Sequence, residues 1–262
     1  MPQPIEVSVP TSEQEARALF AAASPLPAGG ATILTPELFS GARAASHVML
    51  LHRAGLDGVR HDTDRVTIGA ATRLSQLGEM PEPLRSAVAG VADREVRAQA
   101  TVGGNICAAP LDGAPRGDLQ GPLLALDAVV HWTDGAEDHR DGMEAFLGDG
   151  DAGEGARGGA ARRLVLGVEF VPPQTGAFAS LRRPHSHGYT ALAVSAAVMG
   201  GELRLAATGL GPHALRLGSA DQPLPDDATF AGRDDALASD WYRREMVPVL
   251  VRRCLEQMEA TA

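Results

Sequence analysis

The stretch from Thr101 to Asp118 limits the possible folds most, because it opens with the glycine pair of T-V-G-G-N. Its first residues resemble the end of an extended segment, and glycine takes backbone angles that a residue with a Cβ avoids. A bend at Gly103-Gly104 can turn several backbone N–H groups into one small space. Such amides bind anionic oxygens, and the Thr101 hydroxyl and Asn105 add neutral hydrogen-bonding groups at the rim. The segment predicts a phosphate site, with an ordinary Gly-Gly turn as the alternative.

A second glycine turn lies upstream, in P-A-G-G-A-T from Pro27 to Thr32. It follows an expected helix that starts with a capping-box signature, Ser12 with Glu15 three residues on. This turn also offers free amides in a bend. Because two such turns in one domain can grip the two phosphates of a dinucleotide, the pair favours a ligand site.

The two turns resemble a known pair of loops. A-G-G-x-x-x-L at 28–34 and T-V-G-G-N at 101–105 are similar to the flavin-binding loops of the FAD-binding subunit of the molybdenum hydroxylases, the family of xanthine dehydrogenase and of the medium subunit of aerobic carbon monoxide dehydrogenase. Four further stretches resemble the family in the same order: R-V-T-I-G-A-A-T (65–72), V-R-A-Q-A-T-V-G-G-N (96–105), R-G-D-L-Q-G-P-L-L-A-L (116–126) and W-Y-R-R-E-M-V-P-V-L-V-R-R (241–253). The resemblance covers nearly the whole chain.

The resemblance implies an α+β fold of the vanillyl-alcohol-oxidase (PCMH) type, in which two subdomains clasp FAD and a C-terminal antiparallel sheet with helices follows. We expect an FAD-binding domain over residues 1–172, with subdomains of about 1–55 and 56–172, and a C-terminal domain over 173–262. Apolar alternation and helical spacing agree. They predict strands at 5–9, 48–51, 65–71, 129–132 and 164–170, helices at 84–92 and 119–126, C-terminal strands at 178–183, 189–199, 203–208 and 213–217, and a last helix at 241–258 that kinks or restarts at Pro248.

The resemblance also implies the residues that contact FAD. They are Ala28, Gly29, Gly30, Ala31, Thr32, Ile33 and Leu34 in the first loop, Thr101, Gly103, Gly104, Asn105 and Cys107 in the second, and Asp118, Leu164 and Tyr189 beyond it.

Three of these residues keep an alternative. Asp118 is expected to accept hydrogen bonds from ribityl hydroxyls, or to cap the helix that follows it. Tyr189 lies where related subunits place an aromatic residue against the flavin ring, or is a half-buried core tyrosine. Thr32 adds a hydroxyl to the site, or is a surface turn residue.

The chain departs from the family pattern in a few places. The family often has a lysine ahead of the Arg-Arg pair, whereas this chain has no lysine, so that contact is absent or is made by Arg182 or Arg183. The run around Gly153-x-Gly155-x-x-Gly158 is formally a dinucleotide fingerprint but lacks the strand before it, which predicts a loop. His185 and His187 have no third ligand in sight, so we expect no metal site there.

Composition excludes some classes of function. The chain carries 33 acidic and 23 basic residues, all of the latter arginine, and a formal charge of −10. No basic stripe occurs, so nucleic acid is not an expected partner. Because the chain is acidic overall, a bound pyrophosphate must be neutralised locally by backbone amides and helix ends. Cys107 and Cys254 are too few for an iron–sulfur cluster and indicate a reducing compartment. No segment is apolar over the ~20 residues of a membrane span, so we expect a cytoplasmic protein.

The function implied by the resemblance is electron transfer. A large subunit with the molybdenum cofactor oxidises substrate, a small subunit with 2Fe-2S clusters relays electrons, and FAD on this chain passes them to an external acceptor. No residue of this chain is expected to act as a catalytic acid or base. Two alternatives are a degenerate assembly scaffold without flavin and a self-contained flavin reductase of the same fold.

Overall fold

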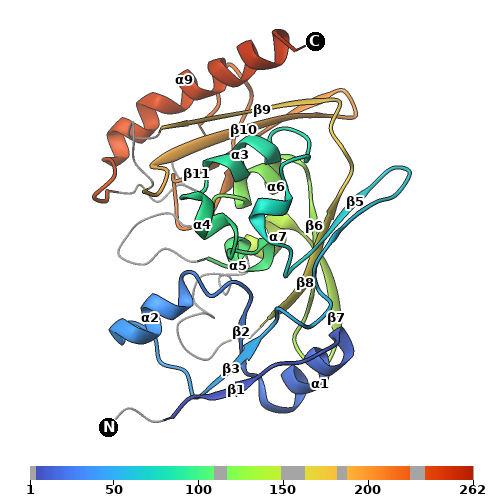
Figure 1. The fold of residues 1–262 in the computed structure, drawn as a ribbon. Coiled ribbons are helices and arrows are strands. Elements are labelled where there is room, and N and C mark those ends of the chain that lie inside the picture. Colours follow the sequence, from blue (N-terminus) through green and yellow to red (C-terminus); the bar gives the residue numbers. More distant parts are fainter. Residues whose placement is uncertain (1–3, 109–116, 149–162, 182–187, 225–233, 262) are drawn as a thin grey trace.

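The computed structural model describes residues 4–108, 117–148, 163–181, 188–224 and 234–261 (Figure 1). Three features predicted above lie outside these ranges. They are the fingerprint between Gly153 and Gly158, the Arg182-Arg183 pair, and the histidines His185 and His187.

The N-terminal part is a small parallel sheet with a helix in each connection (Figure 1). Its strands run in the order β1 (Glu6–Ser8), β3 (His47–Leu50) and β2 (Leu26–Ala28). The chain joins β1 to β2 through α1 (Glu13–Ala23), and β2 to β3 through α2 (Leu34–Ser40). The sequence pattern did not predict α2, because its seven residues include Thr and Pro and show no apolar face.

Helix α1 begins as its sequence predicts, with one difference in the capping bonds. The Ser12 hydroxyl accepts a hydrogen bond from the Glu15 amide at 3.2 Å. The Glu15 carboxylate accepts from the amide and hydroxyl of Thr11, at 2.7 and 2.8 Å, rather than from Ser12. The helix ends at Ser24, whose φ of 44° is left-handed.

The middle of the chain forms an antiparallel sheet covered on one face by short helices (Figure 1). Its strand order is β4 (Val59–His61), β5 (Val66–Gly69), β8 (Leu164–Phe170), β6 (Val129–Thr133) and β7 (Asp138–Gly142). The short helices are η1 (Leu74–Gln76, a 3-10 turn), α3 (Leu84–Gly90), α4 (Arg94–Arg97), α5 (Val102–Ile106), α6 (Gln120–Ala125) and α7 (Met143–Gly148). The sequence pattern missed β7 because this edge strand, D-H-R-D-G, has no buried residue to produce apolar alternation.

The C-terminal part is a four-stranded antiparallel sheet in the order β12 (Leu215–Arg216), β11 (Glu202–Thr208), β10 (Leu192–Met199) and β9 (Thr175–Leu181). The long helix α9 (Asp240–Glu259) follows it and runs through Pro248 as one element, so the helix does not restart there. The predicted α+β class, with a C-terminal antiparallel sheet and helix, is confirmed.

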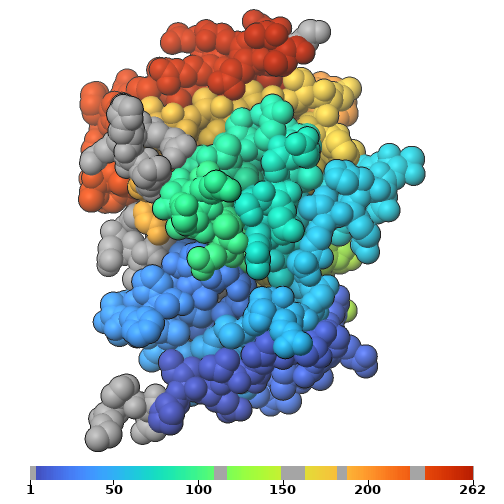
Figure 2. Space-filling model, viewed as in Figure 1, coloured from blue at the N-terminus to red at the C-terminus, as the bar shows by residue number. Residues whose placement is uncertain are grey.

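Residues of β10 and β11 are apolar on both faces because the sheet is buried between two layers. Leu192, Val194 and Leu205 belong to the core under α9. Ala197 and Ala206, on the opposite face, belong to the large core of the middle part. The middle part therefore shares one continuous core with the C-terminal sheet, and in Figure 2 the three parts stack along the molecule from the blue N-terminus to the red helix α9.

Candidate functional site

The two glycine loops, 73 residues apart along the chain at Gly30 and Gly103, pack against each other. A Cβ built on Gly29 would lie 2.2 Å from Thr101 Oγ1, and one on Gly30 would lie 1.9 Å from the carbonyl oxygen of Gln99. Both distances are far below any real contact. The absence of side chains at these two glycines is therefore what allows the loops to touch.

The predicted bend at Gly103-Gly104 is wrong in its conformation. Thr101 caps a short helix, α5, and both glycines lie inside that helix. Neither has a positive φ; in the first loop the left-handed residue is Ala31, with a φ of 53°. Gly103 is needed for close packing instead, because its Cβ would lie 3.0 Å from the Cβ of Ala70. Non-glycine residues in the left-handed region are uncommon and cluster at functional sites.

The amides of the second loop are occupied by the protein itself. The N–H of Val102 donates to the Thr72 carbonyl at 3.0 Å and that of Gly103 donates to the Ala70 carbonyl at 2.8 Å. The Gly104 amide donates to Thr101 Oγ1 at 3.3 Å. These bonds fix the loop to the end of β5, so the second loop does not supply the free amide cluster that its sequence predicts.

The amides of the first loop are available. Among the described residues, no hydrogen bond takes up the N–H groups of residues 29–33. These groups follow the end of β2, in a turn that contains the left-handed Ala31. Turns of this kind direct successive N–H groups toward one concavity and bind anionic oxygens there. The first loop is thus the better candidate for the phosphate contacts.

Gly104 presents an open face beside the first loop. Its Cβ would meet nothing within 4 Å except Thr101 Oγ1, at 3.1 Å, and the residue is exposed. Gly103, its neighbour, is buried. The two glycines therefore differ: Gly103 packs the loop against Ala70 at the end of β5, and Gly104 has an open outer side.

Asn105 and Asp118 lie at a joint between the two short helices α5 and α6. Asn105 is 7% exposed, and its Oδ1 accepts the amide hydrogen of Leu119 at 2.8 Å. This bond brings Asp118, the preceding residue, next to the second loop. The alternative role of Asp118 as a helix cap is not what the structure has, because α6 is capped at Leu119 and without a side-chain bond.

The remaining predicted residues are spread out. Cys107 follows α5, and burial raises the pKa of its thiol to about 12, so the sulfur stays protonated at neutral pH. Tyr189, 42% exposed, precedes β10 in the C-terminal part. Leu164 has no exposed surface and packs with Phe20 and Met49 under the N-terminal sheet, so it has a packing role and no face for a ligand.

The acidic residue that follows the first loop in the sequence is part of an ion pair. The nearest carboxylate along the sequence, Glu37, is 6% exposed and is paired with Arg43 at 2.8 Å. The sequence offered no signal for this pair, because its two members lie beyond the loop motif.

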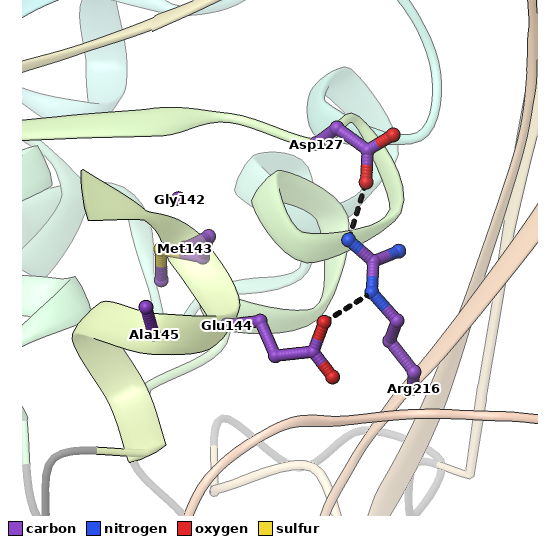
Figure 3. A pocket seen from close by; sticks show the side chains of 6 residues that line it. All are labelled: Asp127, Gly142, Met143, Glu144, Ala145 and Arg216. Atoms are coloured by element: carbon purple, nitrogen blue, oxygen red, sulfur yellow. Dashed lines mark hydrogen bonds and ion pairs between the residues drawn. The ribbon is translucent and has the colours of Figure 1, made fainter. Parts of the chain in front are cut away.

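A separate pocket of about 430 Å³ lies at the joint with the C-terminal sheet (Figure 3). Arg216 on β12 donates to Glu144 at 2.7 Å and also pairs with Asp127. Arg204 contacts Asp127 from β11. Because the charged groups drawn in Figure 3 satisfy one another, we interpret this network as a structural joint rather than a ligand site.

The described residues contain neither a metal cluster nor a membrane-spanning helix. They hold no group of three or more His, Cys, Asp or Glu side chains placed to bind a metal ion. Within the same ranges, no helix combines the length and apolar character that crossing a membrane requires.

Sequence reasoning missed the residues that receive the two loops. The carbonyls of Ala70 and Thr72 hold the second loop, and the backbone of Gln99 meets Gly30. The only sequence signal was the family-like motif R-V-T-I-G-A-A-T, which contains Ala70 and Thr72. Sequence reasoning also did not single out Gln120, whose side chain is buried between α5 and the C-terminal sheet.

Comparisons with known proteins identify the family and the fold. A family model described as the FAD binding domain in molybdopterin dehydrogenase matches residues 3–165, more than half of the chain. Comparison with curated protein sequences gave no match. Among solved structures, the chain is similar to reconstituted CO dehydrogenase from Oligotropha carboxidovorans, at 23% identity and a TM-score of 0.80 over 100% of both chains. It is also similar to quinoline 2-oxidoreductase from Pseudomonas putida 86, at 18% identity and a TM-score of 0.81 over 100% of this chain and 99% of the other.

The residues present fit FAD, since free amides in the first loop and the open face of Gly104 lie at the contact between the two loops. The family match spans both loops and four of the five strands of the middle sheet, β4 to β7. The chain therefore belongs to the family of FAD-binding domains of molybdopterin dehydrogenases, as an FAD-binding subunit of the molybdenum-hydroxylase type.

Proposed function

We propose that this chain is the electron-transfer flavoprotein subunit of a heterotrimeric molybdenum hydroxylase in the cytoplasm. In this proposal a large subunit holds the molybdenum cofactor, a small subunit holds 2Fe-2S clusters, and the FAD of this chain delivers electrons to an external acceptor. The contact between the two glycine loops carries the proposal, together with the family match and the full-length likeness to a CO dehydrogenase chain.

The first loop would hold the diphosphate of FAD through its unoccupied amides at residues 29–33. Backbone amides suit this task in a chain of charge −10, because they bind phosphate oxygens without needing a favourable overall field. The second loop would close the cradle with the bare face of Gly104 and the Asn105 carboxamide. Thr101 would act indirectly, since its hydroxyl caps α5 and touches the first loop.

The remaining candidates would serve the rest of the cofactor. Asp118 would accept hydrogen bonds from ribityl hydroxyls, and Tyr189 would lie against the flavin ring. FAD supplies the redox chemistry when bound, and the protein contributes its binding and orientation. We also propose the division into residues 1–172 and 173–262, which the membership of the three sheets supports.

The proposal is tested on the complex purified through an affinity tag on this chain. We expect one FAD per copy of the chain, and molybdenum and iron on two other polypeptides. The complex is reduced with dithionite, excess reductant is removed, and oxidation of the iron–sulfur clusters by oxygen, NAD or a quinone is followed by absorbance. Removal of FAD should slow this oxidation at least tenfold, and added FAD should restore it.

Equal rates with and without FAD would overturn the electron-transfer role. A colourless chain that takes up no FAD would instead identify a scaffold. A yellow chain that purifies without molybdenum and iron would identify a self-contained flavin reductase.

A further inference from the structure

Helices α5 and α6 hold each other through a reciprocal pair of hydrogen bonds. The Asn105 side chain on α5 accepts the Leu119 amide at the start of α6, at 2.8 Å. In return, Gln120 Nε2 on α6 donates to the carbonyl oxygen of Ile106 on α5, at 2.9 Å. The second glycine loop is therefore tied to α6 at two points, one from each helix.

Gln120 also reaches the C-terminal part. Its Oε1 accepts the amide hydrogen of Ala214, in the loop between β11 and β12, at 3.1 Å. One carboxamide thus uses its donor on α5 and its acceptor on the C-terminal sheet. It is 2% exposed, so water cannot replace either bond without rearrangement.

The backbone of Gly117 further restricts this side chain. A Cβ on Gly117 would lie 2.4 Å from Gln120 Nε2, so the backbone just before Asp118 packs on the carboxamide. Three segments meet at Gln120: the second glycine loop, the approach to Asp118, and the loop at Ala214. Each of the first two carries a proposed FAD contact.

We propose that Gln120 is a positioning residue for the flavin site, which transmits the position of the C-terminal sheet to the second glycine loop. The proposal rests on the proposed flavin site, because it places the cofactor beside α5. Gln120 has no assigned contact with FAD. It acts by holding α5 through Ile106 while it is itself held by Ala214.

The substitution Gln120→Glu tests this role because the shape of the side chain is unchanged. An ionised Glu has no donor for the Ile106 carbonyl, whereas a protonated Glu has both a donor and an acceptor. Burial against a carbonyl raises the pKa of a carboxyl group. The dissociation constant for FAD should rise about tenfold at pH 8, which corresponds to 1.4 kcal/mol, and should return toward the wild-type value as the pH falls through the pKa of the introduced carboxyl group.

The controls separate positioning from general destabilisation. Gln257→Glu makes the same chemical change on an exposed site of α9 and should leave FAD binding unchanged. Leu123→Ala, in the core under α6, should lower thermal stability without a pH-dependent FAD affinity. His213, next to Ala214, titrates in all variants, so the wild-type pH profile is the baseline.

The outcomes discriminate between the two proposals. If the wild-type full-length chain binds FAD and Gln120→Glu binds it equally well at every pH, the positioning role is wrong and the flavin site stands. If Gln120→Glu loses FAD equally at all pH values, the defect is structural and the positioning role is also rejected. If the wild type itself binds no FAD, the flavin site fails first.

Discussion

Gly29 and Thr101 form the direct contact between the two glycine loops: a Cβ on Gly29 would lie 2.2 Å from Thr101 Oγ1. The same hydroxyl accepts the Gly104 amide and so caps α5. Thr101 therefore links the entrance of one loop to the helix of the other, and any side chain at Gly29 must displace it.

We predict a coupling between Gly29→Ala and Thr101→Ala. The first change forces the loops apart and should destabilise the protein by about 1–3 kcal/mol, with loss of FAD. The second removes a helix cap, which costs about 1 kcal/mol. Because Thr101→Ala also removes the atom that the new Cβ meets, the double variant should lose less stability than the two single losses combined. Urea unfolding of the four proteins measures this, and strict additivity would contradict the contact.

Gly104→Val should abolish retention of FAD and leave the fold intact. A Cβ here would meet only Thr101 Oγ1 within 4 Å outside its own helix backbone, so a valine side chain should extend into the space that we assign to the ligand. Gly78→Val is the matched control, because a Cβ there meets nothing within 4 Å and Gly78 lies outside both loops. Absorbance at the flavin band and circular dichroism report the two properties. Normal FAD content in folded Gly104→Val would refute the placement of the cofactor.

Arg243→Met should be strongly destabilising. The Arg243 side chain is fully buried, pairs with the buried Asp235 at 2.5 Å and donates to the Gly209 carbonyl at 2.8 Å. Removing one member of a buried ion pair costs about 3–5 kcal/mol, because the other charge is left without compensation. Arg252→Met, which breaks an exposed pair with Glu256, should cost less than ~1 kcal/mol. Chemical denaturation distinguishes them, and equal losses would contradict the burial of the first pair.

Thr208→Val should be neutral or stabilising. Its hydroxyl is buried and has no hydrogen-bond partner among the described residues, and an unsatisfied buried hydroxyl costs about 1–3 kcal/mol. Gly121→Ala should be destabilising, since its Cβ would lie 2.6 Å from that hydroxyl oxygen. Thr208→Ala should relieve part of this clash in the double variant. A large loss of stability in Thr208→Val, measured by thermal unfolding, would show that the hydroxyl has a partner.

Both thiols should react slowly in the folded protein. Burial raises the pKa of Cys107 and of Cys254 to about 12, and the thiolate is the reactive form. A disulfide reagent at pH 8 should modify both thiols far more slowly in the native chain than in denaturant, and the buried Cys254 more slowly than the partly exposed Cys107. Each folded pKa lies above the unfolded value of ~8.5. The contribution of the protonated thiols to the free energy of unfolding is therefore complete below that pH and is lost as the pH rises toward 12. Rapid native labelling at pH 8 would show that a thiol is accessible.

The sequence alone determined the fold class and the pair of loops. Apolar alternation identified β5, β6 and β8 because each has a buried face, and the family-like order of motifs pointed to FAD. It could not identify β7 or α2, since the edge strand D-H-R-D-G and the short L-T-P-E-L-F-S segment lack a periodic apolar pattern.

Only the tertiary structure decided how the glycines act. A glycine in sequence suggests unusual backbone angles, yet Gly29, Gly30 and Gly103 have ordinary angles. At these positions another segment packs so closely on the backbone that there is no room for a side chain. The structure also showed that amides of the second loop donate to the carbonyls of Ala70 and Thr72, whereas no hydrogen bond within the described ranges takes up the amides of residues 29–33. Close approach and hydrogen-bond partners depend on residues distant in sequence, and for that reason no local pattern contains them.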